Sequence, residues 1–152
     1  MTKMTHTAAI EHRLRSFGVR PTRQRVNLLR LFYRFGDRHV AAEQLYQEAL
    51  TDGIHLSLAT VYNTLNHLAA IGMIRKVVVN TGQTFFDTNN SDHHHYYVEG
   101  RNQVFDVQAN DIEVSQLPEP PEGFEIAGVE IVVRLKPKVP KTETKSGAST
   151  NC

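Results

Sequence analysis

The hydrophobic spacing of this 152-residue chain changes near Met73, and the change limits the folds that the chain can adopt. From residue 5 to residue 72, apolar residues recur at three- and four-residue intervals, which predicts helices. After Met73 apolar and polar residues tend to alternate, which predicts strands. The chain is therefore expected to be an α+β protein with a helical N-terminal half and a β-rich C-terminal half.

Capping residues and glycines delimit the expected helices. The helices should start at Thr5, Thr22, Ala41 and Ser57 and end at Gly18, Gly36, Gly53 and Gly72. A hairpin with strands 74–79 and 84–87 follows the fourth helix directly. A helix, a turn, a capped helix and then a hairpin is the layout of a winged helix-turn-helix, in which the second helix of the motif enters the major groove of DNA.

The C-terminal half is expected to contain two paired strands, 94–99 and 103–107, and a long strand, 124–135. Residues 110–116 could form a short helix. The segment 117–123 carries three prolines and is expected to be a connector. From Lys136 onward the chain is poor in apolar residues and is expected to be disordered.

The charge of the two halves has opposite sign. Residues 1–76 hold 11 Lys and Arg against 5 Asp and Glu, whereas residues 77–152 hold 6 against 11. A net +6 in the helical half suggests a polyanion partner, and a net −5 in the histidine-bearing half could attract cations. The alternative is a chance imbalance on two solvated surfaces.

Several classes of protein are not expected. The chain has no apolar run long enough to span a membrane and no apolar N-terminal stretch typical of a secretory signal, so a cytoplasmic location is expected. Its one cysteine, Cys152, allows no intrachain disulfide and no four-cysteine structural zinc site.

The outward face of the helix that starts at Ser57 is polar but largely uncharged. Thr60 suits a thymine methyl group, and Asn63 can pair with an adenine edge. Tyr62 offers a flat apolar ring with a hydroxyl tip. Arg20 lies in the short link before the second helix, where it could enter a narrow minor groove or be an ordinary surface arginine. Arg23 belongs to an arginine-rich set that is suited to phosphate neutralisation.

Three consecutive histidines, His93, His94 and His95, form the chemical centre of the sequence. On a strand His93 and His95 would face one side and His94 the other. Imidazoles with nearby carboxylates suit Mn, Fe and Zn, and a histidine run can also ligate haem iron. The candidate carboxylates are Asp87, Asp92 and Glu113. A solvated polar turn is the alternative, and His39 taken alone is a weak candidate ligand.

Four ordered motifs resemble the ferric uptake regulator family. They are Gly-Val-Arg-Pro-Thr-Arg-Gln-Arg (18–25), His-Val-Ala-Ala-Glu-Gln-Leu-Tyr (39–46), Ser-Leu-Ala-Thr-Val-Tyr-Asn-Thr-Leu (57–65), and Phe-Asp (86–87) with the histidine run. The resemblance covers about residues 8–136. Within the family, His-His-His-Tyr-Tyr, the missing cysteines and the segment 117–123 resemble the iron response regulator subgroup.

The resemblance implies a homodimer or a higher oligomer with three parts. These are a winged-helix domain that includes the hairpin wing and hinge (1–88), a small α/β metal- or haem-sensing dimerisation domain (89–137) and a disordered tail (138–152). It maps DNA contacts onto Arg20 and Tyr62, and Asn63 replaces a basic residue that is common in the family.

The resemblance also implies a regulatory metal site between the domains, formed by His39, Asp87, His93 and His95. A second site would use Asp92, His94 and Glu113, but its usual fourth histidine is Val129 here, so this site is doubtful or completed by water. The family's Cys-x-x-Cys zinc positions fall on Val98 and Arg101. The subgroup's N-terminal Cys-Pro is also missing, so haem would have to bind through His93, His94 and His95.

The leading hypothesis is a non-enzymatic transcription regulator of iron and haem homeostasis. It would bind A/T-rich operator DNA in the apo or metal-bound form, repress genes under iron limitation and release DNA on binding haem. One alternative is an Fe(II), Mn(II) or Zn(II) corepressor-type sensor without a haem response. Others are a metalloenzyme, which lacks an evident general base, and a metal or haem carrier with a vestigial DNA-binding domain.

Overall fold

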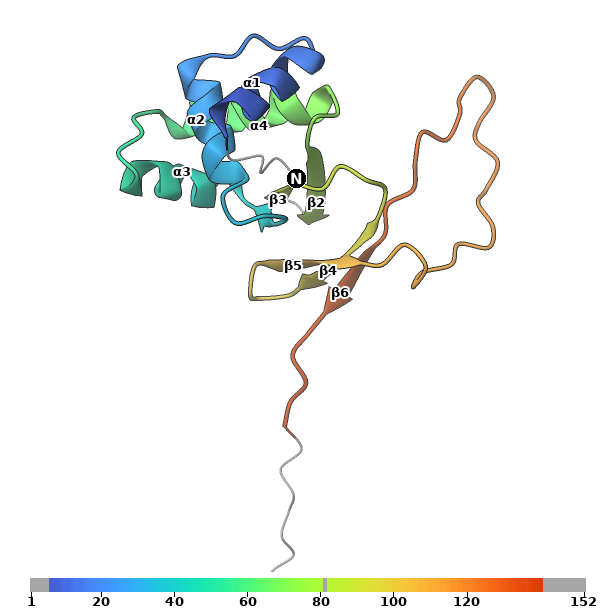
Figure 1. Ribbon diagram of the computed structural model, residues 1–152. Coiled ribbons are helices and arrows are strands. Elements are labelled where there is room, and N and C mark those ends of the chain that lie inside the picture. Colours follow the sequence, from blue (N-terminus) through green and yellow to red (C-terminus); the bar gives the residue numbers. More distant parts are fainter. Residues whose placement is uncertain (1–5, 81, 141–152) are drawn as a thin grey trace, which may run out of the picture.

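A computed structural model describes residues 6–80 and 82–140 of the chain (Figure 1). The helices are α1 (Thr7–Ser16), α2 (Arg23–Phe32), α3 (Ala42–Thr51) and α4 (Leu58–Ala70). They pack beside an antiparallel sheet of β1 (His39–Val40), β2 (Arg75–Asn80) and β3 (Gln83–Asp87), in the order β1-β3-β2. The predicted arrangement of helices followed by a hairpin is confirmed, and the short strand β1 is an addition to it.

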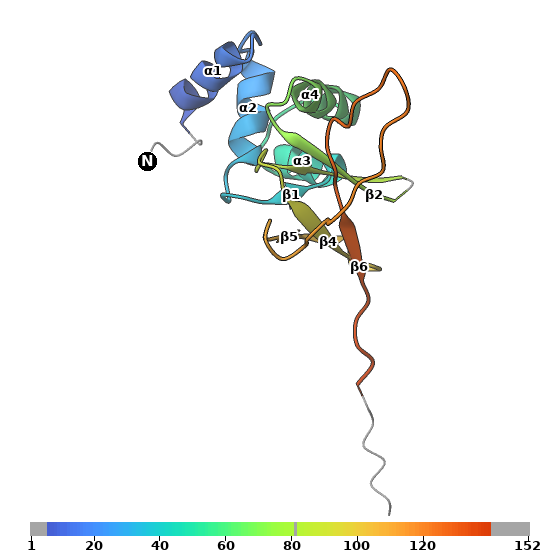
Figure 2. The same cartoon turned by 90° about the vertical axis from the view of Figure 1, so that its right-hand side faces the viewer.

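A second sheet lies below the first and has the order β5-β4-β6 (Figure 1). It consists of β4 (His94–Val98), β5 (Gln103–Val107) and β6 (Val132–Leu135). β4 pairs antiparallel with β5 and parallel with β6. Residues 108–131, here called the strap, form a long irregular loop between β5 and β6 that rises beside the helical part (Figure 2).

Two side chains explain where α2 and α4 begin. The hydroxyl of Thr22 accepts a hydrogen bond from the backbone N–H of Arg25 at 3.3 Å, and that of Ser57 accepts one from Thr60 at 3.1 Å. These bonds satisfy backbone donors that a helix start leaves unpaired. At the other end of α4, Gly72 has a φ of 81°, a conformation that favours glycine and turns the chain into β2.

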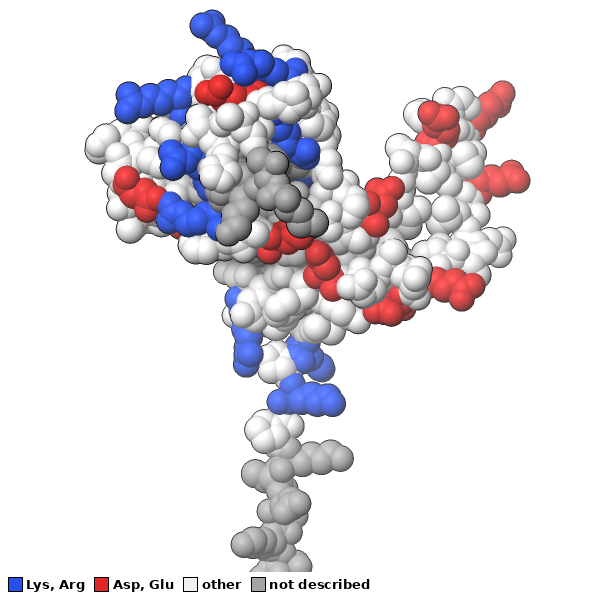
Figure 3. Space-filling model, viewed as in Figure 1, with Lys and Arg blue, Asp and Glu red and all other residues white. Residues whose placement is uncertain are grey.

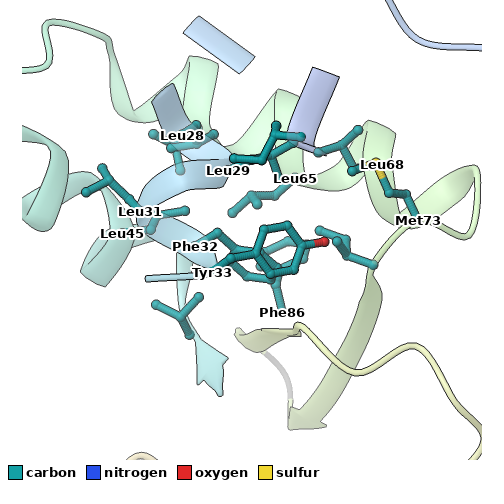
Figure 4. Packing of buried hydrophobic residues seen from close by; sticks show 14 of the residues in the cluster. Leu28, Leu29, Leu31, Phe32, Tyr33, Leu45, Leu65, Leu68, Met73 and Phe86 are labelled. Atoms are coloured by element: carbon teal, nitrogen blue, oxygen red, sulfur yellow. The ribbon is translucent and has the colours of Figure 1, made fainter. Parts of the chain in front are cut away.

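The main hydrophobic core is formed within the first 86 residues (Figure 4). Phe32 of α2, Leu45 of α3, Leu65 of α4 and Phe86 of β3 are all fully buried in it. A smaller cluster joins the two sheets. There Val77, Val79 and Phe85 of the wing hairpin pack with two residues of the second sheet, Tyr97 and Val104.

The structure corrects two expectations for the C-terminal half. Residues 110–116 form turns and irregular chain and no helix, and only Val132–Leu135 of the predicted strand 124–135 is a strand. Residues 124–131 belong to the strap and are not assigned to a strand, and Phe124 there is 74% exposed.

Some expectations lie outside the described residues: the cap at Thr5, part of the hairpin turn and most of the predicted tail. Residues 138–140 are described, and they are extended and exposed. Among the described helices, none combines the length and the apolar character needed to cross a bilayer.

Candidate metal centre and nucleic-acid interface

Five side chains converge between the two sheets: His39, Asp87, His93, His95 and Asp106. Each offers one ligand atom, and these atoms all lie within 4.8 Å of one another. His39 and Asp87 are opposite each other on β1 and β3, and His95 and Asp106 are opposite each other on β4 and β5. The first sheet therefore supplies two of these residues, the second sheet supplies two more, and His93 lies in the connection before β4.

The three imidazoles all direct Nε2 toward the same pair of carboxylates. The Oδ2 atom of Asp87 lies 2.9 Å from Nε2 of His39, 2.9 Å from Nε2 of His93 and 3.1 Å from Nε2 of His95. The Oδ1 atom of Asp106 lies 2.8, 2.9 and 3.6 Å from the same three nitrogens. Three nitrogens and two carboxylate oxygens thus surround one small volume.

The electrostatics of the centre couple its acids and bases. Burial by itself would raise the pKa of Asp87, but the imidazoles of His39 and His95, whose Nε2 atoms lie close to its Oδ2, hold that pKa well below its usual range. Burial opposes the charged form of His39, yet the close carboxylate of Asp87, together with that of Asp106, raises the pKa of His39. The centre therefore holds the negative charge of Asp87 beside the imidazole of His39, which can exchange a proton for a cation.

The donor set fits a divalent transition metal. Nε2 of His39 is buried and has no hydrogen-bond partner of acceptable geometry within the described chain, although two carboxylate oxygens lie within 3 Å. Mixed imidazole and carboxylate donors suit Mn, Fe(II) and Zn, whereas Ca and Mg prefer oxygen donors alone. The four residues predicted for the regulatory site, His39, Asp87, His93 and His95, are brought together.

Asp106 is the member of the cluster that the sequence analysis missed. It lies on β5 directly opposite His95 of β4. The strands themselves were predicted, so pairing them in this register would have placed a carboxylate across from a candidate histidine ligand. The position of Asp106 opposite His95 was therefore the signal in the sequence that could have identified it as a metal ligand.

The structure does not bring the three candidates for a second metal site together. The side chain of Asp92 is fully exposed, and Nδ1 of His94 accepts a hydrogen bond from the backbone N–H of Ile131 at 3.1 Å. His94 lines a cavity of about 270 Å³ together with Val129, and Glu113 is not among the lining residues. This set remains a prediction without an assembled donor geometry.

The haem candidates have different surroundings. His93 and His95 are buried in the five-residue centre, with 8% and 0% of their surface exposed. His94 is half-buried and faces the opposite side, in the cavity that Val114, Leu117 and Val129 also line. His94 is thus the member of the run that lies outside the five-residue centre, although His93 also lines this cavity.

The predicted DNA-contacting residues lie on α4 and around the start of α2. Asn63 is exposed, as are Arg20 and Arg23, and Thr60 is half-buried. Tyr62 is half-buried as well, and its hydroxyl donates a hydrogen bond to Glu43 of α3. This bond to a carboxylate raises the pKa of Tyr62, and it engages the hydroxyl hydrogen.

The charges predicted from the two halves of the sequence occupy different parts of the molecule. Lys and Arg side chains gather over the helices, and acidic side chains follow the strap (Figure 3). The exposed strap carboxylates are Asp111, Glu113, Glu119, Glu122 and Glu125. A polyanion would therefore be attracted to the helical part and repelled by the strap.

Comparisons with known proteins identify relatives of this chain. The sequence model of the ferric uptake regulator family matches residues 16–134. The ferric uptake regulation protein of Bordetella parapertussis is 30% identical over 104 residues, which cover 68% of this chain and 75% of that protein. The peroxide-responsive repressor PerR of Staphylococcus aureus is 32% identical over 103 residues, 66% of this chain and 69% of that protein.

Solved structures share the fold. The ferric uptake regulator from Pseudomonas aeruginosa with manganese has a TM-score of 0.66 at 24% identity, covering 91% of this chain and 100% of that one. The regulator from Francisella tularensis with iron also has a TM-score of 0.66, at 23% identity, covering 80% and 94%. The expected α+β class is confirmed, and so is the prediction that the chain is not an enzyme, because these relatives are transcription regulators.

Proposed function

The chain belongs to the ferric uptake regulator family, whose members are metal-responsive transcription regulators, and from this premise we propose that it regulates iron- and haem-related genes. It acts as a homodimer that binds A/T-rich operator DNA through its winged-helix half. A divalent metal, Mn(II), Fe(II) or Zn(II), binds at the centre between the sheets.

The observation that carries this proposal is the origin of the five donors. His39 and Asp87 come from the wing-side sheet, whereas His95 and Asp106 come from the second sheet. A bound cation would supply one positive centre that both sheets ligate. The angle between the DNA-binding half and the second sheet is then fixed by the ligands that each side contributes.

DNA recognition rests on α4 and the arginines around α2. Asn63 reads an adenine edge, Thr60 contacts a thymine methyl group and Tyr62 presents its ring and hydroxyl. Arg20 and Arg23 are exposed at the entry to α2, where they neutralise phosphates or enter the minor groove. Preference for adenine and thymine follows from the side chains of Asn63 and Thr60.

A haem response of the iron response regulator type is the finer part of the proposal. His94 offers a half-buried ring beside a cavity whose aliphatic side suits the edge of a porphyrin. The residues that line this cavity include Val114, Leu117 and Val129 as well as Asp92 and His93. Haem ligation by His93 or His95 would remove donors from the five-residue centre, so haem and a divalent metal would compete. Haem binding then weakens DNA binding and relieves repression under conditions of sufficient iron.

The alternative is a corepressor-type metal sensor with no haem response. The burial of His93 and His95 among carboxylates favours it, because these two histidines are already committed to the metal centre. In that case the whole response of the protein to iron passes through the five donors.

A mobility shift on A/T-rich promoter DNA from an iron-regulated gene tests the proposal. The apo protein is compared with additions of Mn(II), Fe(II), Zn(II) and haem, using the parent, His93→Ala and His94→Ala. Release of DNA by haem that is lost in His94→Ala, with a histidine-ligated Soret band in the parent, supports the haem response. Tightening by metal that is lost in His93→Ala, with no specific effect of haem, supports the alternative.

A matched variant tests the DNA-binding assignment. Tyr62→Ala should abolish the shift and leave metal affinity unchanged, because Tyr62 lies outside the donor cluster. Metal or haem binding with no sequence-specific DNA binding in the parent would overturn the regulator proposal and leave a carrier.

A further inference from the structure

A second set of polar groups lies behind the metal centre, at the Nδ1 side of the histidine rings. Oε1 of Glu130 is 3.3 Å from Nδ1 of His95, and Oε2 of Glu130 is 3.9 Å from Nη2 of Arg75. Nη1 of Arg75 donates to the carbonyl of Ser91 at 2.7 Å, and the same carbonyl lies 2.6 Å from Nδ1 of His93. Arg75 thus contacts the group behind each of two histidines of the centre.

The Nδ1 atom of His95 lacks a hydrogen-bond partner on this side of the ring within the described part of the chain. It is fully buried, its Nε2 points into the centre, and its Nδ1 has no well-aligned hydrogen-bond partner among residues 6–80 and 82–140. An imidazole that ligates through Nε2 carries its proton on Nδ1. A buried N–H without an acceptor is destabilising, and metal-ligating histidines almost always donate this hydrogen to a carboxylate, a carbonyl or a water.

Glu130 is placed to be that acceptor. It does not belong to the five-residue donor set, because it faces the opposite side of the His95 ring. Its side chain is 34% exposed and can still rotate, whereas that of Arg75 is 17% exposed and is anchored by Ser91. A small reorientation of the Glu130 carboxylate would align this 3.3 Å contact as a hydrogen bond.

We propose that Glu130 is the carboxylate that positions His95 for metal binding, and that Arg75 holds Glu130 and the Ser91 carbonyl in place behind the centre. This inference deepens the proposed function and rests on one part of it, the binding of a divalent metal at the five donors.

Glu130 and Arg75 lie on elements outside the metal centre, which they would connect to it. Glu130 lies at the end of the strap, two residues before β6, and Arg75 is the first residue of β2 and pairs with Asp87 of β3. A hydrogen bond from His95 to Glu130 would therefore tie the end of the strap to the metal-bound centre. The strap carries most of the exposed acidic residues among the described residues of the second half, so this hydrogen bond would link an acidic segment to the metal centre.

Metal titrations of the full-length protein test the inference. Glu130→Ala should weaken Co(II) or Mn(II) affinity by about 10- to 100-fold, the usual cost of losing such a supporting group. Glu130→Gln keeps an acceptor and should recover part of that loss. Glu125→Gln removes an exposed strap carboxylate and serves as the matched control, with parent affinity expected. The thermal midpoint of the apo protein should stay unchanged in all three variants.

A spectroscopic measurement separates positioning from general stability. In the Zn(II) form labelled with ¹⁵N-histidine, the Nδ1–H of His95 should be protected from exchange in the parent and lose that protection in Glu130→Ala. Parent affinity in Glu130→Ala overturns the inference, and so does a loss of affinity matched by a lower apo midpoint. Reduced metal affinity in Glu130→Ala without metal-dependent DNA binding in the parent overturns the proposed function but supports this inference.

Discussion

Asp106 is the acidic residue of β5, and it contributes a negative charge to the centre. Its Oδ1 atom lies within 3 Å of the Nε2 atoms of His39 and His93, and its side chain is 36% exposed. We expect Asp106→Asn to weaken Mn(II) affinity at least as much as the loss of a supporting group, about tenfold or more. Isothermal titration calorimetry measures the change. Asp111→Asn, an exposed carboxylate of the strap, is the control, and equal affinities in the two variants would show that Asp106 is not a ligand.

The metal affinity should increase with pH because of His39. Asp87 and Asp106 raise the pKa of His39 above its ordinary value of about 6.5, so its proton must leave before a metal can bind. Below the raised pKa, loss of this one proton should increase affinity by up to about tenfold per pH unit. Mn(II) titrations between pH 6 and pH 8.5 measure the slope, which should be shallower in His39→Ala. An identical slope in that variant would assign the proton to another group.

The same pKa shift affects the stability of the apo protein. A group whose pKa is raised on folding stabilises the folded state below its unfolded pKa, and this stabilisation is lost as the pH rises through the folded pKa. The His39 contribution to apo stability therefore declines over the range in which metal affinity grows. A metal-saturated sample should not show this decline, because His39 is then neutral throughout.

Four of the five donors could be predicted because they carry a residue-level signal: adjacent histidines, an aspartate at a strand end, and a histidine in a recognisable motif. Asp106 carries no such signal. An aspartate within Gln-Val-Phe-Asp-Val resembles any polar residue on the solvent side of a strand, and its role depends on the β4–β5 register. Glu130 could not be predicted for a similar reason. It lies near His95 because the strap places it next to β6, which pairs with β4.

At the scale of secondary-structure elements, Arg38 connects α2 to α3. Its guanidinium donates to the carbonyls of Leu31 and Phe32 at the end of α2, at 2.8 and 3.1 Å. It also donates to both carboxylate oxygens of Glu48 on α3, at 2.9 and 2.8 Å. These bonds join the two helices, and an ion pair between Arg34 and Asp52 links the segments that follow them.

Removal of the Glu48 charge should therefore destabilise the helical half. We expect Glu48→Gln to lower the free energy of unfolding by about 1 kcal/mol at pH 7, since the pair remains partly open to solvent. Urea unfolding followed by circular dichroism measures the change. Glu11→Gln breaks an exposed i,i+4 pair with Arg15 and should cost less than about 0.5 kcal/mol.

The pH dependence of the Glu48 effect has a defined sign. The hydrogen bond from Arg38 lowers the pKa of Glu48, so its contribution is present above the unfolded pKa and is lost as the pH falls through the folded pKa. The difference between the parent and Glu48→Gln should shrink as the pH is lowered from 5 toward 3. A difference that stays constant over this range would assign the destabilisation to packing rather than charge.

The elements themselves were predictable where a local signal exists. The caps at Thr22 and Ser57 fixed the starts of α2 and α4, and the change of period located the wing hairpin. The two residues of β1 are too few to show a period, and they form a strand because β3 lies beside them. Residues 124–131 carry apolar residues typical of a strand, but they lie in the strap and are not assigned to a strand, which a local pattern does not report.

At the scale of the whole molecule, two apolar clusters divide the chain unequally. The main cluster takes all its buried residues from the range 10–86, so the winged-helix half is complete in itself. The smaller cluster draws Val77, Val79 and Phe85 from the first half and Tyr97 and Val104 from the second. The second sheet therefore depends on the wing for its core, whereas the winged-helix half does not depend on the second sheet.

This asymmetry predicts that the fragment 1–88 folds alone. It should keep its helical circular dichroism and unfold cooperatively, with a lower midpoint than the full chain because Val77, Val79 and Phe85 become exposed. It should bind metal poorly, since His93, His95 and Asp106 are absent, and it should retain weak, metal-independent DNA binding through α4. The fragment 89–152, which lacks the wing side of the smaller cluster, should be unfolded and serves as the contrast. A disordered 1–88 fragment would mean that the metal centre and the second sheet are needed to complete the winged-helix core, so that metal sensing and folding would be one event.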